Sequence, residues 1–160
     1  MERSEVIDIL SRMNALPADA DALDADAITF DAYRLVEDPI VTNRIAVEAI
    51  QQLPRNHKFD VVLAANEESE LFAYALAMAA WARFAAADFE SGAGLVDGYH
   101  IDKDEKVLIV DTLVDEATSF EDAIDLIAES KAKKAGAIAL IARGDCAPLS
   151  EHFYPLLRFA

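Results

Sequence analysis

KVLIVDTLVDEATSFEDAID, residues 106–125, is the stretch that decides the fold of this chain. Its first part, Val107 to Val110, is a run of four apolar, mostly β-branched residues, which is typical of a strand buried on both faces of a parallel sheet. Asp111 ends the run, so we expect a loop to begin there. Thr118 stands three residues before Glu121, the spacing of a capping box, and predicts the start of a helix. The predicted order is therefore strand, loop, helix.

Other segments of the chain repeat this pattern. Residues 59–65 predict a second buried strand, residues 70–82 an Ala-rich helix, and residues 137–142 a further strand. The alternation predicts an α/β fold, a doubly wound, mainly parallel sheet flanked by helices. In such sheets ligands bind in the crevice at the carboxyl ends of the strands, where a helix start offers unpaired N–H groups to an anion.

We expect a single domain over residues 1–160, in three parts. Residues 1–27 should hold an amphipathic helix and an acidic Ala/Asp link, and residues 28–144 the core, beginning with a strand over residues 28–36. Residues 145–160 form an apolar tail, which should pack on the sheet edge or on a second subunit.

Several local features are also predicted. Thr42 or Asn43 should begin a helix, and Trp81 should lie in the core. The helix that follows the loop after Asp111 should run to about residue 134 and stop at Gly136, because basic residues in a last turn and a glycine beyond it complement the helix dipole. The basic residues of that last turn would be Lys131, Lys133 and Lys134.

The composition limits the choice of partners and compartment. A net charge of −16 and a pI near 4.3 argue against nucleic acid and anionic membranes as partners, since both would repel the chain. The longest small-apolar run, residues 72–81, is too short to span a bilayer, and we expect no signal peptide. The single cysteine, Cys146, excludes an internal disulfide, fits a reducing cytoplasm and is expected to be a small buried residue.

Residues 106–125 resemble the signature of the type I phosphoribosyltransferases, a hydrophobic strand, two acidic residues and a Thr/Gly-rich loop that cradles the 5′-phosphate of phosphoribosyl pyrophosphate. Residues 28–39 (ITFDAYRLVEDP), 59–77 and 94–111 are similar to other parts of the orotate enzymes. The resemblance covers roughly residues 28–144, with the orotate branch closest and the adenine branch next. It implies phosphoribosyl transfer to a base with the help of magnesium, and a homodimer.

The chain departs from that signature in its polar positions. Asp111 is followed by Thr112, where the family usually has a second acid. The phosphate loop, usually Thr-Thr-Gly-Gly-Thr, is replaced by Asp115, Glu116, Ala117, Thr118 and Ser119. A carboxylate and a phosphate about 5 Å apart repel by about 3 kcal/mol per charge pair at an effective dielectric constant near 20. We therefore expect weak phosphate binding, with the chain's own carboxylates meeting the N–H groups that a phosphate would have met.

Two more segments that the resemblance places in contact with the anionic substrate are also acidic. The resemblance implies a glycine-bearing pyrophosphate loop, and the equivalent residues here are Asn66, Glu67, Glu68 and Ser69. Where the family usually carries a basic pair, the chain reads Ala-Asp-Phe-Glu over residues 87–90, and no basic residue lies between Arg83 and Lys103.

Three functions remain open. The preferred one is a non-catalytic phosphoribosyltransferase-fold protein that acts as a binding, regulatory or structural subunit, with a protein partner. The second is an active orotate- or purine-type transferase that uses phosphoribosyl pyrophosphate and magnesium. The third is a divalent-cation site in which Asp111, Asp115 and Glu116 supply oxygen ligands to calcium or magnesium.

Overall fold

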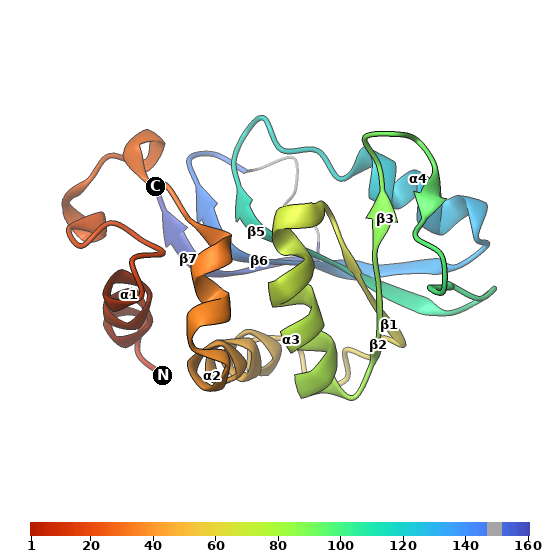
Figure 1. The fold of residues 1–160 in the computed structure, drawn as a ribbon, viewed down its shortest axis with the longest axis horizontal. Helices are drawn as coiled ribbons and strands as arrows, with labels where there is room; N and C mark the ends of the chain where they lie inside the picture. Colours follow the sequence, from red (N-terminus) through yellow and green to blue (C-terminus); the bar gives the residue numbers. More distant parts are fainter. Residues whose placement is uncertain (147–151) are drawn as a thin grey trace.

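Five parallel strands form the centre of the molecule (Figure 1). The computed structural model describes residues 1–146 and 152–160. In the order in which they lie side by side, the strands are β2 (Arg83–Ala85), β1 (Val61–Ala64), β5 (Lys106–Val114), β6 (Lys133–Arg143) and β7 (Phe153–Phe159). The three apolar runs that the sequence analysis identified lie in β1, β5 and β6, so the predicted parallel sheet is confirmed.

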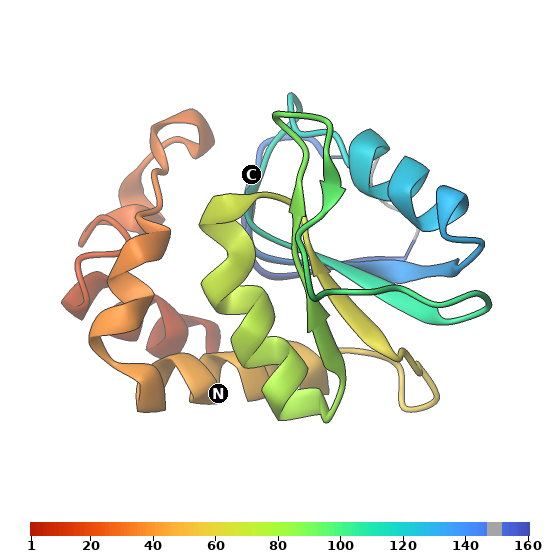
Figure 2. The same cartoon turned by 45° about the vertical axis from the view of Figure 1, so that its right-hand side comes forward.

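Helices cover both faces of this sheet, as the doubly wound fold requires (Figures 1 and 2). Leu108 and Val110 of β5 point into a core shared with helices α1 to α3, whereas Val107 and Ile109 pack with α4 on the other face. Successive strand residues point to opposite faces, so a strand that is apolar at every position is buried on both. The helices are α1 (Arg3–Arg12), α2 (Pro39–Gln51), α3 (Glu70–Ala80) and α4 (Glu121–Glu129).

The segment expected to open the core as a strand is not one. Ala32–Glu37 is a 3-10 helix, because the side chain of Asp31 accepts a hydrogen bond from the Tyr33 N–H (3.2 Å) and nucleates a turn. Helix α2 begins at Pro39, earlier than Thr42, because Asp38 caps it by accepting from the Val41 N–H at 3.0 Å.

The signature strand is longer, and its helix shorter, than predicted. β5 continues through Asp111 to Val114, so the loop starts at Asp115. Thr118 is not the helix cap: the N-cap residue of α4 is Phe120, and the Ser119 hydroxyl before it accepts a hydrogen bond from the Glu121 N–H at 3.1 Å.

Helix α4 ends at Glu129, so the lysines expected in its last turn lie elsewhere. Lys131 follows the helix with a left-handed backbone (φ 55°), and Lys133 and Lys134 are the first residues of β6. Gly136 lies inside β6 at φ 129°, where a Cβ atom would come within 2.8 Å of the His152 carbonyl oxygen. It therefore serves close strand packing and does not stop a helix.

Two smaller features complete the fold. Ala87–Asp88 (β3) and Gly94–Leu95 (β4) pair antiparallel and form a separate hairpin. The apolar tail supplies β7, which pairs with β6 and forms one edge of the sheet, as the sequence analysis allowed; its residues 147–151 lie outside the described residues. No helix in the described part of the chain is long and apolar enough to cross a membrane.

All lysines of the chain lie at the edge of the sheet where the strands begin. Because the strands are parallel, this edge is opposite the predicted ligand crevice. Each lysine is exposed, and within residues 1–146 and 152–160 none forms an ion pair. They are Lys58, Lys103, Lys106, Lys131, Lys133 and Lys134. The lysines of the molecule are therefore concentrated away from its ligand crevice.

Candidate functional site

The carboxyl ends of β1 and β5 are joined by a buried polar cluster. Asp111 is 4% exposed, and its Oδ1 lies 2.8 Å from the Ser69 hydroxyl and 3.2 Å from the Asn66 Nδ2. The same oxygen accepts a hydrogen bond from the Thr112 N–H at 2.7 Å. Asn66 in turn accepts from the Ser69 N–H at 3.0 Å, which shapes the turn before α3. Four predicted site residues are thus brought together, and their side chains bind one another.

This cluster fixes the loop between β1 and α3, the equivalent of the pyrophosphate loop. Ser69 is fully buried, whereas Glu67 and Glu68 project from the loop and are exposed. Buried polar groups need hydrogen-bond partners, and here each partner comes from the neighbouring strand end or from the loop itself. The loop therefore exposes the carboxylates of Glu67 and Glu68 to solvent. The Ser69 hydroxyl and the Asn66 side-chain amide instead form hydrogen bonds within the protein.

A hollow of about 310 Å³ opens between this loop and the hairpin of β3 and β4. Four of its lining residues are acidic and none is basic: Ala65, Asn66, Glu67, Glu70, Ala87, Asp88, Phe89, Glu90 and Val96 line it. Burial, and then the charge of Glu67, raise the pKa of Glu70, whereas a hydrogen bond from the Ser91 N–H lowers the pKa of Asp88. The hollow favours positive charge and repels anions.

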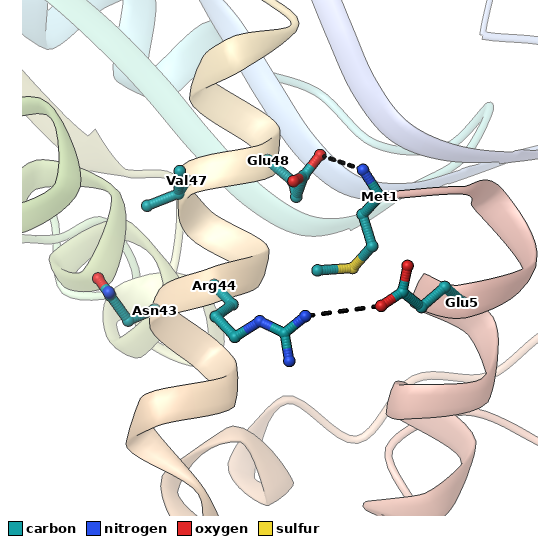
Figure 3. A pocket seen from close by; sticks show the side chains of 6 residues that line it. All are labelled: Met1, Glu5, Asn43, Arg44, Val47 and Glu48. Carbon is teal, nitrogen blue, oxygen red and sulfur yellow. Dashed lines mark hydrogen bonds and ion pairs between the residues drawn. The ribbon is translucent and has the colours of Figure 1, made fainter.

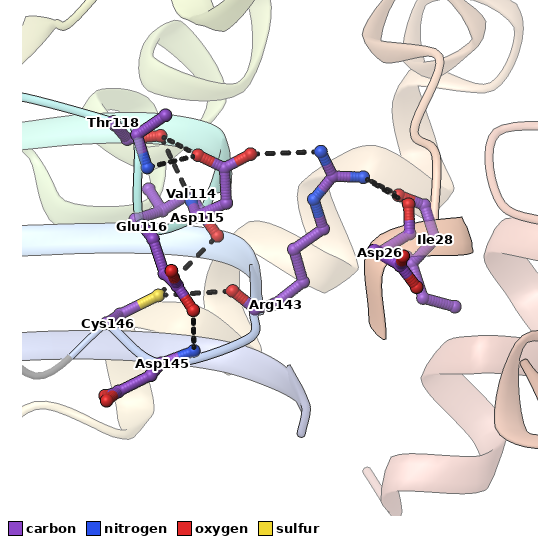
Figure 4. Close-up of polar contacts among 10 residues, drawn as sticks. Asp26, Ile28, Val114, Asp115, Glu116, Thr118, Arg143, Asp145 and Cys146 are labelled. Carbon is purple, nitrogen blue, oxygen red and sulfur yellow. Dashed lines mark hydrogen bonds and ion pairs between the residues drawn. The ribbon is translucent and has the colours of Figure 1, made fainter. Parts of the chain in front are cut away.

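The signature loop is folded around its own aspartate (Figure 4). Asp115 Oδ1 accepts from the Ala117 N–H at 2.9 Å and from the Thr118 hydroxyl at 3.2 Å, and the Asp115 N–H donates to the Thr118 hydroxyl oxygen at 3.0 Å. A side-chain carboxylate thus takes a backbone N–H of the loop, which is the contact that the sequence analysis expected in place of a phosphate.

Arg143, at the end of β6, binds the other oxygen of this carboxylate. The guanidinium lies 3.0 Å from Asp115 Oδ2 and also donates to the carbonyl oxygens of Ile28 and Asp26 (Figure 4). Its hydrogen bond is the main reason that the pKa of Asp115 is lowered. By the family resemblance, residues 143–145 stand where many members carry an Asp-Arg pair that contacts the base, although the order of the residues differs here. That resemblance did not predict the pairing of Arg143 with Asp115; the available signal was an arginine at the end of a buried strand, at the ligand edge of the sheet.

A second hollow, of about 490 Å³, lies beside this contact. Glu116 lines it and accepts a hydrogen bond from the Asp145 N–H at 3.4 Å. Its single basic lining residue is Arg143, which is already paired; the lining residues are Asp24, Ala25, Asp26, Asp115, Glu116, Ala117, Arg143, Gly144 and Ala160. The hollow is therefore also acidic on balance.

The structure does not assemble the predicted cation ligands. Asp111 accepts hydrogen bonds from Ser69 and Asn66, and Asp115 forms an ion pair with Arg143. Among the described residues no three His, Cys, Asp or Glu side chains are grouped closely enough to hold a metal ion.

A further hollow between α1 and α2 is part of the helix packing. Glu48 pairs with the amino group of Met1 at 3.1 Å, and Arg44 pairs with Glu5 at 3.5 Å, so both ion pairs join the two helices (Figure 3). The hollow lies at a helix junction, away from the strand ends, and we assign it no function.

The sequence of the chain matches a family model over most of its length. The model, described as the phosphoribosyl transferase domain, matches residues 36–156. The chain belongs to this family. A search of curated proteins found no match.

Solved structures of phosphoribosyltransferases share the fold. Leishmania donovani UMP synthase superposes with a TM-score of 0.77 at 22% identity, over 96% of this chain and 36% of that one. Aeropyrum pernix orotate phosphoribosyltransferase gives 0.73 at 14% identity, over 96% and 93%. An adenine phosphoribosyltransferase from Thermoanaerobacter pseudethanolicus gives 0.63 at 17% identity, over 79% and 84%.

The match to the family model confirms the predicted family, and the UMP synthase and the orotate enzyme superpose with higher TM-scores than the adenine enzyme. The chain spans about a third of the UMP synthase, so it corresponds to one part of that protein. At these identities the comparisons establish the phosphoribosyltransferase fold, and the activity has to be argued from the site.

Proposed function

We propose that this chain is a phosphoribosyltransferase-fold protein that does not catalyse phosphoribosyl transfer and serves as a binding, regulatory or structural subunit. The observation that carries the proposal is the hollow beside the hairpin, which four carboxylates line without a basic residue. Catalysis by this family depends on holding a pyrophosphate leaving group and offsetting its charge. A site of the same sign as its ligand cannot do this.

The carboxylates of the hollow oppose a bound pyrophosphate by charge repulsion. Glu67 and Asp88 are exposed, so solvent screens the repulsion that each of them exerts on a phosphate. All four carboxylates nevertheless act in the same direction, against anion binding, and no basic residue in the lining offsets them.

The signature loop supports the same proposal. A phosphate would have to displace Asp115 from the Ala117 N–H and from Arg143, and would still meet Glu116 at the rim. The carboxylate therefore acts as a built-in substitute for the anion.

One observation favours the alternative of an active orotate- or purine-type enzyme. Arg143 stands at the rim of the second hollow and would be released to pair with a phosphate if Asp115 moved away. Magnesium bound with the substrate would supply additional positive charge. On this alternative Asp111, which the family signature retains, would face the ribose.

Calorimetric titration separates these functions. Phosphoribosyl pyrophosphate with magnesium is titrated into the protein, beside magnesium alone and calcium alone, with the Aeropyrum pernix orotate enzyme as the positive control. We expect no binding heat up to about 1 mM ligand in any arm. Heat with the sugar phosphate would establish the enzyme alternative, and heat with a metal alone would establish the cation site.

A double variant tests whether the signature loop alone accounts for the expected lack of phosphoribosyl transfer. Asp115→Thr with Glu116→Thr restores the family's residue type in that loop, but leaves the acidic hollow beside the hairpin unchanged. We expect no turnover, measured as release of pyrophosphate in the presence of orotate or adenine. Turnover in this variant would show that only the signature loop prevents catalysis.

A further inference from the structure

A hollow of about 530 Å³ lies at the edge of the sheet where the strands begin, opposite the ligand crevice. The loop that leads into β1 lines one side of it, and the ends of α2 and α3 line the other. The two hollows at the crevice are acidic, whereas this one is basic on balance. Arg55 and Lys58 line it, with Asp60 as the acidic lining residue. Its charge is opposite in sign to the net charge of the chain, which is −16.

The two basic side chains have no carboxylate partner. Arg55 and Lys58 are exposed, and neither forms an ion pair within the described part of the chain, whereas Arg143 does. The Asp60 carboxylate is itself bound, because its Oδ2 accepts a hydrogen bond from the Lys106 N–H at 2.9 Å. The guanidinium and the ammonium group are therefore both available to an anion.

The remaining walls offer apolar surface and one histidine. Leu53 is buried, and Phe59 and Ala80 are half-buried. The ring of His57 lies beside Phe59, with centroids 6.4 Å apart, and meets the edge of Tyr154 at 5.6 Å. Its Nε2 is buried and has no hydrogen-bond partner among the described residues, which is a costly state for a polar atom. The hollow thus combines apolar surface with polar groups that lack partners.

Two helices end at this hollow. Helix α2 ends at Gln51 and α3 at Ala80, and Trp81, which follows α3, is 98% exposed, so the prediction that Trp81 belongs to the core is wrong. The last carbonyl groups of a helix carry partial negative charge, which nearby basic residues offset. Arg55 and Lys58 can have that structural role without any ligand, so a binding measurement distinguishes the two roles.

We propose that this hollow binds a small organic anion. Its apolar or aromatic body would pack on Leu53 and Phe59, and its phosphate or carboxylate group would be held by Arg55 and Lys58. A guanidinium binds either group through two parallel hydrogen bonds, and the lysine adds a point charge. A hollow of a few hundred Å³, with mostly apolar walls and few charged groups, is typical of small-molecule sites. The site lies at the opposite edge of the sheet from the crevice, so the inference does not depend on the proposed function.

The probe is 1-naphthyl phosphate, titrated into the ¹⁵N-labelled protein and followed by amide chemical shifts. We expect a Kd of about 0.1–1 mM, with the shifts centred on residues 50–60 and on Ala80. 1-Naphthol lacks the charge and inorganic phosphate lacks the apolar body, so each should bind at least about tenfold more weakly. 1-Naphthoate separates the two anion classes: equal affinity would indicate a site for either group, and weaker binding a site for phosphate.

A charge-removing double variant tests the two basic residues. Arg55→Gln with Lys58→Gln should raise the Kd for 1-naphthyl phosphate at least about tenfold. The matched control is Arg12→Gln with Lys103→Gln, which removes the same charge from exposed residues that do not line the hollow and should leave the Kd within about twofold. Both variants change surface side chains only, and their amide spectra show whether the fold is kept.

Three results would overturn the inference. The absence of shifts at about 10 mM 1-naphthyl phosphate would leave the basic residues with their role at the helix ends alone. Shifts centred on residues 66–70 or 115–119 would place the anion in the crevice, and would also contradict the expected rejection of anions there. Equal affinity in Arg55→Gln with Lys58→Gln, or equal binding of 1-naphthol, would show that the charges take no part. Phosphoribosyl pyrophosphate has no apolar body, so we expect it to bind here no more tightly than inorganic phosphate.

Discussion

Replacing Ser69 by alanine should destabilise the fold by about 2 kcal/mol, because it removes a hydrogen bond to a buried carboxylate. The hydroxyl carries one proton and lies 2.8 Å from Asp111 Oδ1 and 2.7 Å from Asn66 Oδ1. Asp111 keeps its contacts with the Asn66 side chain and the Thr112 N–H, so no buried group is left without a partner. The loss is therefore that of one charge-assisted hydrogen bond.

The assay is urea denaturation followed by far-UV circular dichroism. Tryptophan emission is a poor probe here, because Trp81 is already exposed in the folded chain. A loss of about 2 kcal/mol lowers the melting temperature of a domain of this size by about 4–8 °C. Ser91→Ala, at an exposed loop position, is the matched control and should change stability by less than about 0.5 kcal/mol.

A double-mutant cycle makes the prediction stricter. Asp111→Asn is nearly isosteric and removes the charge that strengthens the bond to Ser69. If the two side chains interact, the double variant should lose at least about 0.5 kcal/mol less than the sum of the single losses. A Ser69→Ala chain as stable as wild type, or strictly additive losses, would refute the view that this cluster fixes the loop between β1 and α3.

Three further predictions follow from the same structure. The pKa of Asp115 is lowered, so its ionised form stabilises the fold above pH about 4 and the contribution is lost as the pH falls through the lowered pKa; Asp115→Asn should cost less than about 1 kcal/mol at pH 7 and nothing at pH 2 in urea titrations. Gly136→Ala should lower the melting temperature more than Gly98→Ala, because both have a positive φ but only the first would bring a Cβ atom within 2.8 Å of the His152 carbonyl; equal losses would mean that strain, not contact, decides. Burial raises the pKa of the Cys146 thiol, so Ellman's reagent should label the native chain at least about tenfold more slowly than the chain in urea, and equal rates would contradict the burial.

The central strands could be predicted because the residues within each strand are themselves enough to show that it is buried. Val61–Ala64 and the first half of Lys106–Val114 are buried at nearly every position, and a continuous apolar run is the direct signature of such a strand. The end of the second strand could not be predicted in the same way. Asp111 and Thr112 are polar and yet buried, because Ser69, 42 residues away from Asp111, supplies their hydrogen bonds.

Other predictions were wrong or incomplete for related reasons. Residues 28–36 look apolar enough for a strand, but Asp31 offers the backbone a side-chain partner that favours a turn. Trp81 was assigned to the core as part of the Ala-rich helix, but the helix ends at Ala80 and Trp81, just after it, is 98% exposed. The role of Arg143 depends on Asp115, 28 residues earlier, and such long-range pairs are set by the topology and not by spacing.

The position of the lysines has a practical consequence for binding measurements. Lys106 and Lys133 are neighbours in register at the start of the sheet, and β5 carries the chain about 26 Å from there to its carboxyl end. Amine coupling to a sensor chip would therefore attach the molecule by its lysine edge, with Asp115 and both acidic hollows facing the flow. The amino group of Met1 would compete poorly for coupling, because it is paired with Glu48 and largely covered. Immobilisation through amines should thus present the ligand crevice in a uniform orientation without an engineered tag.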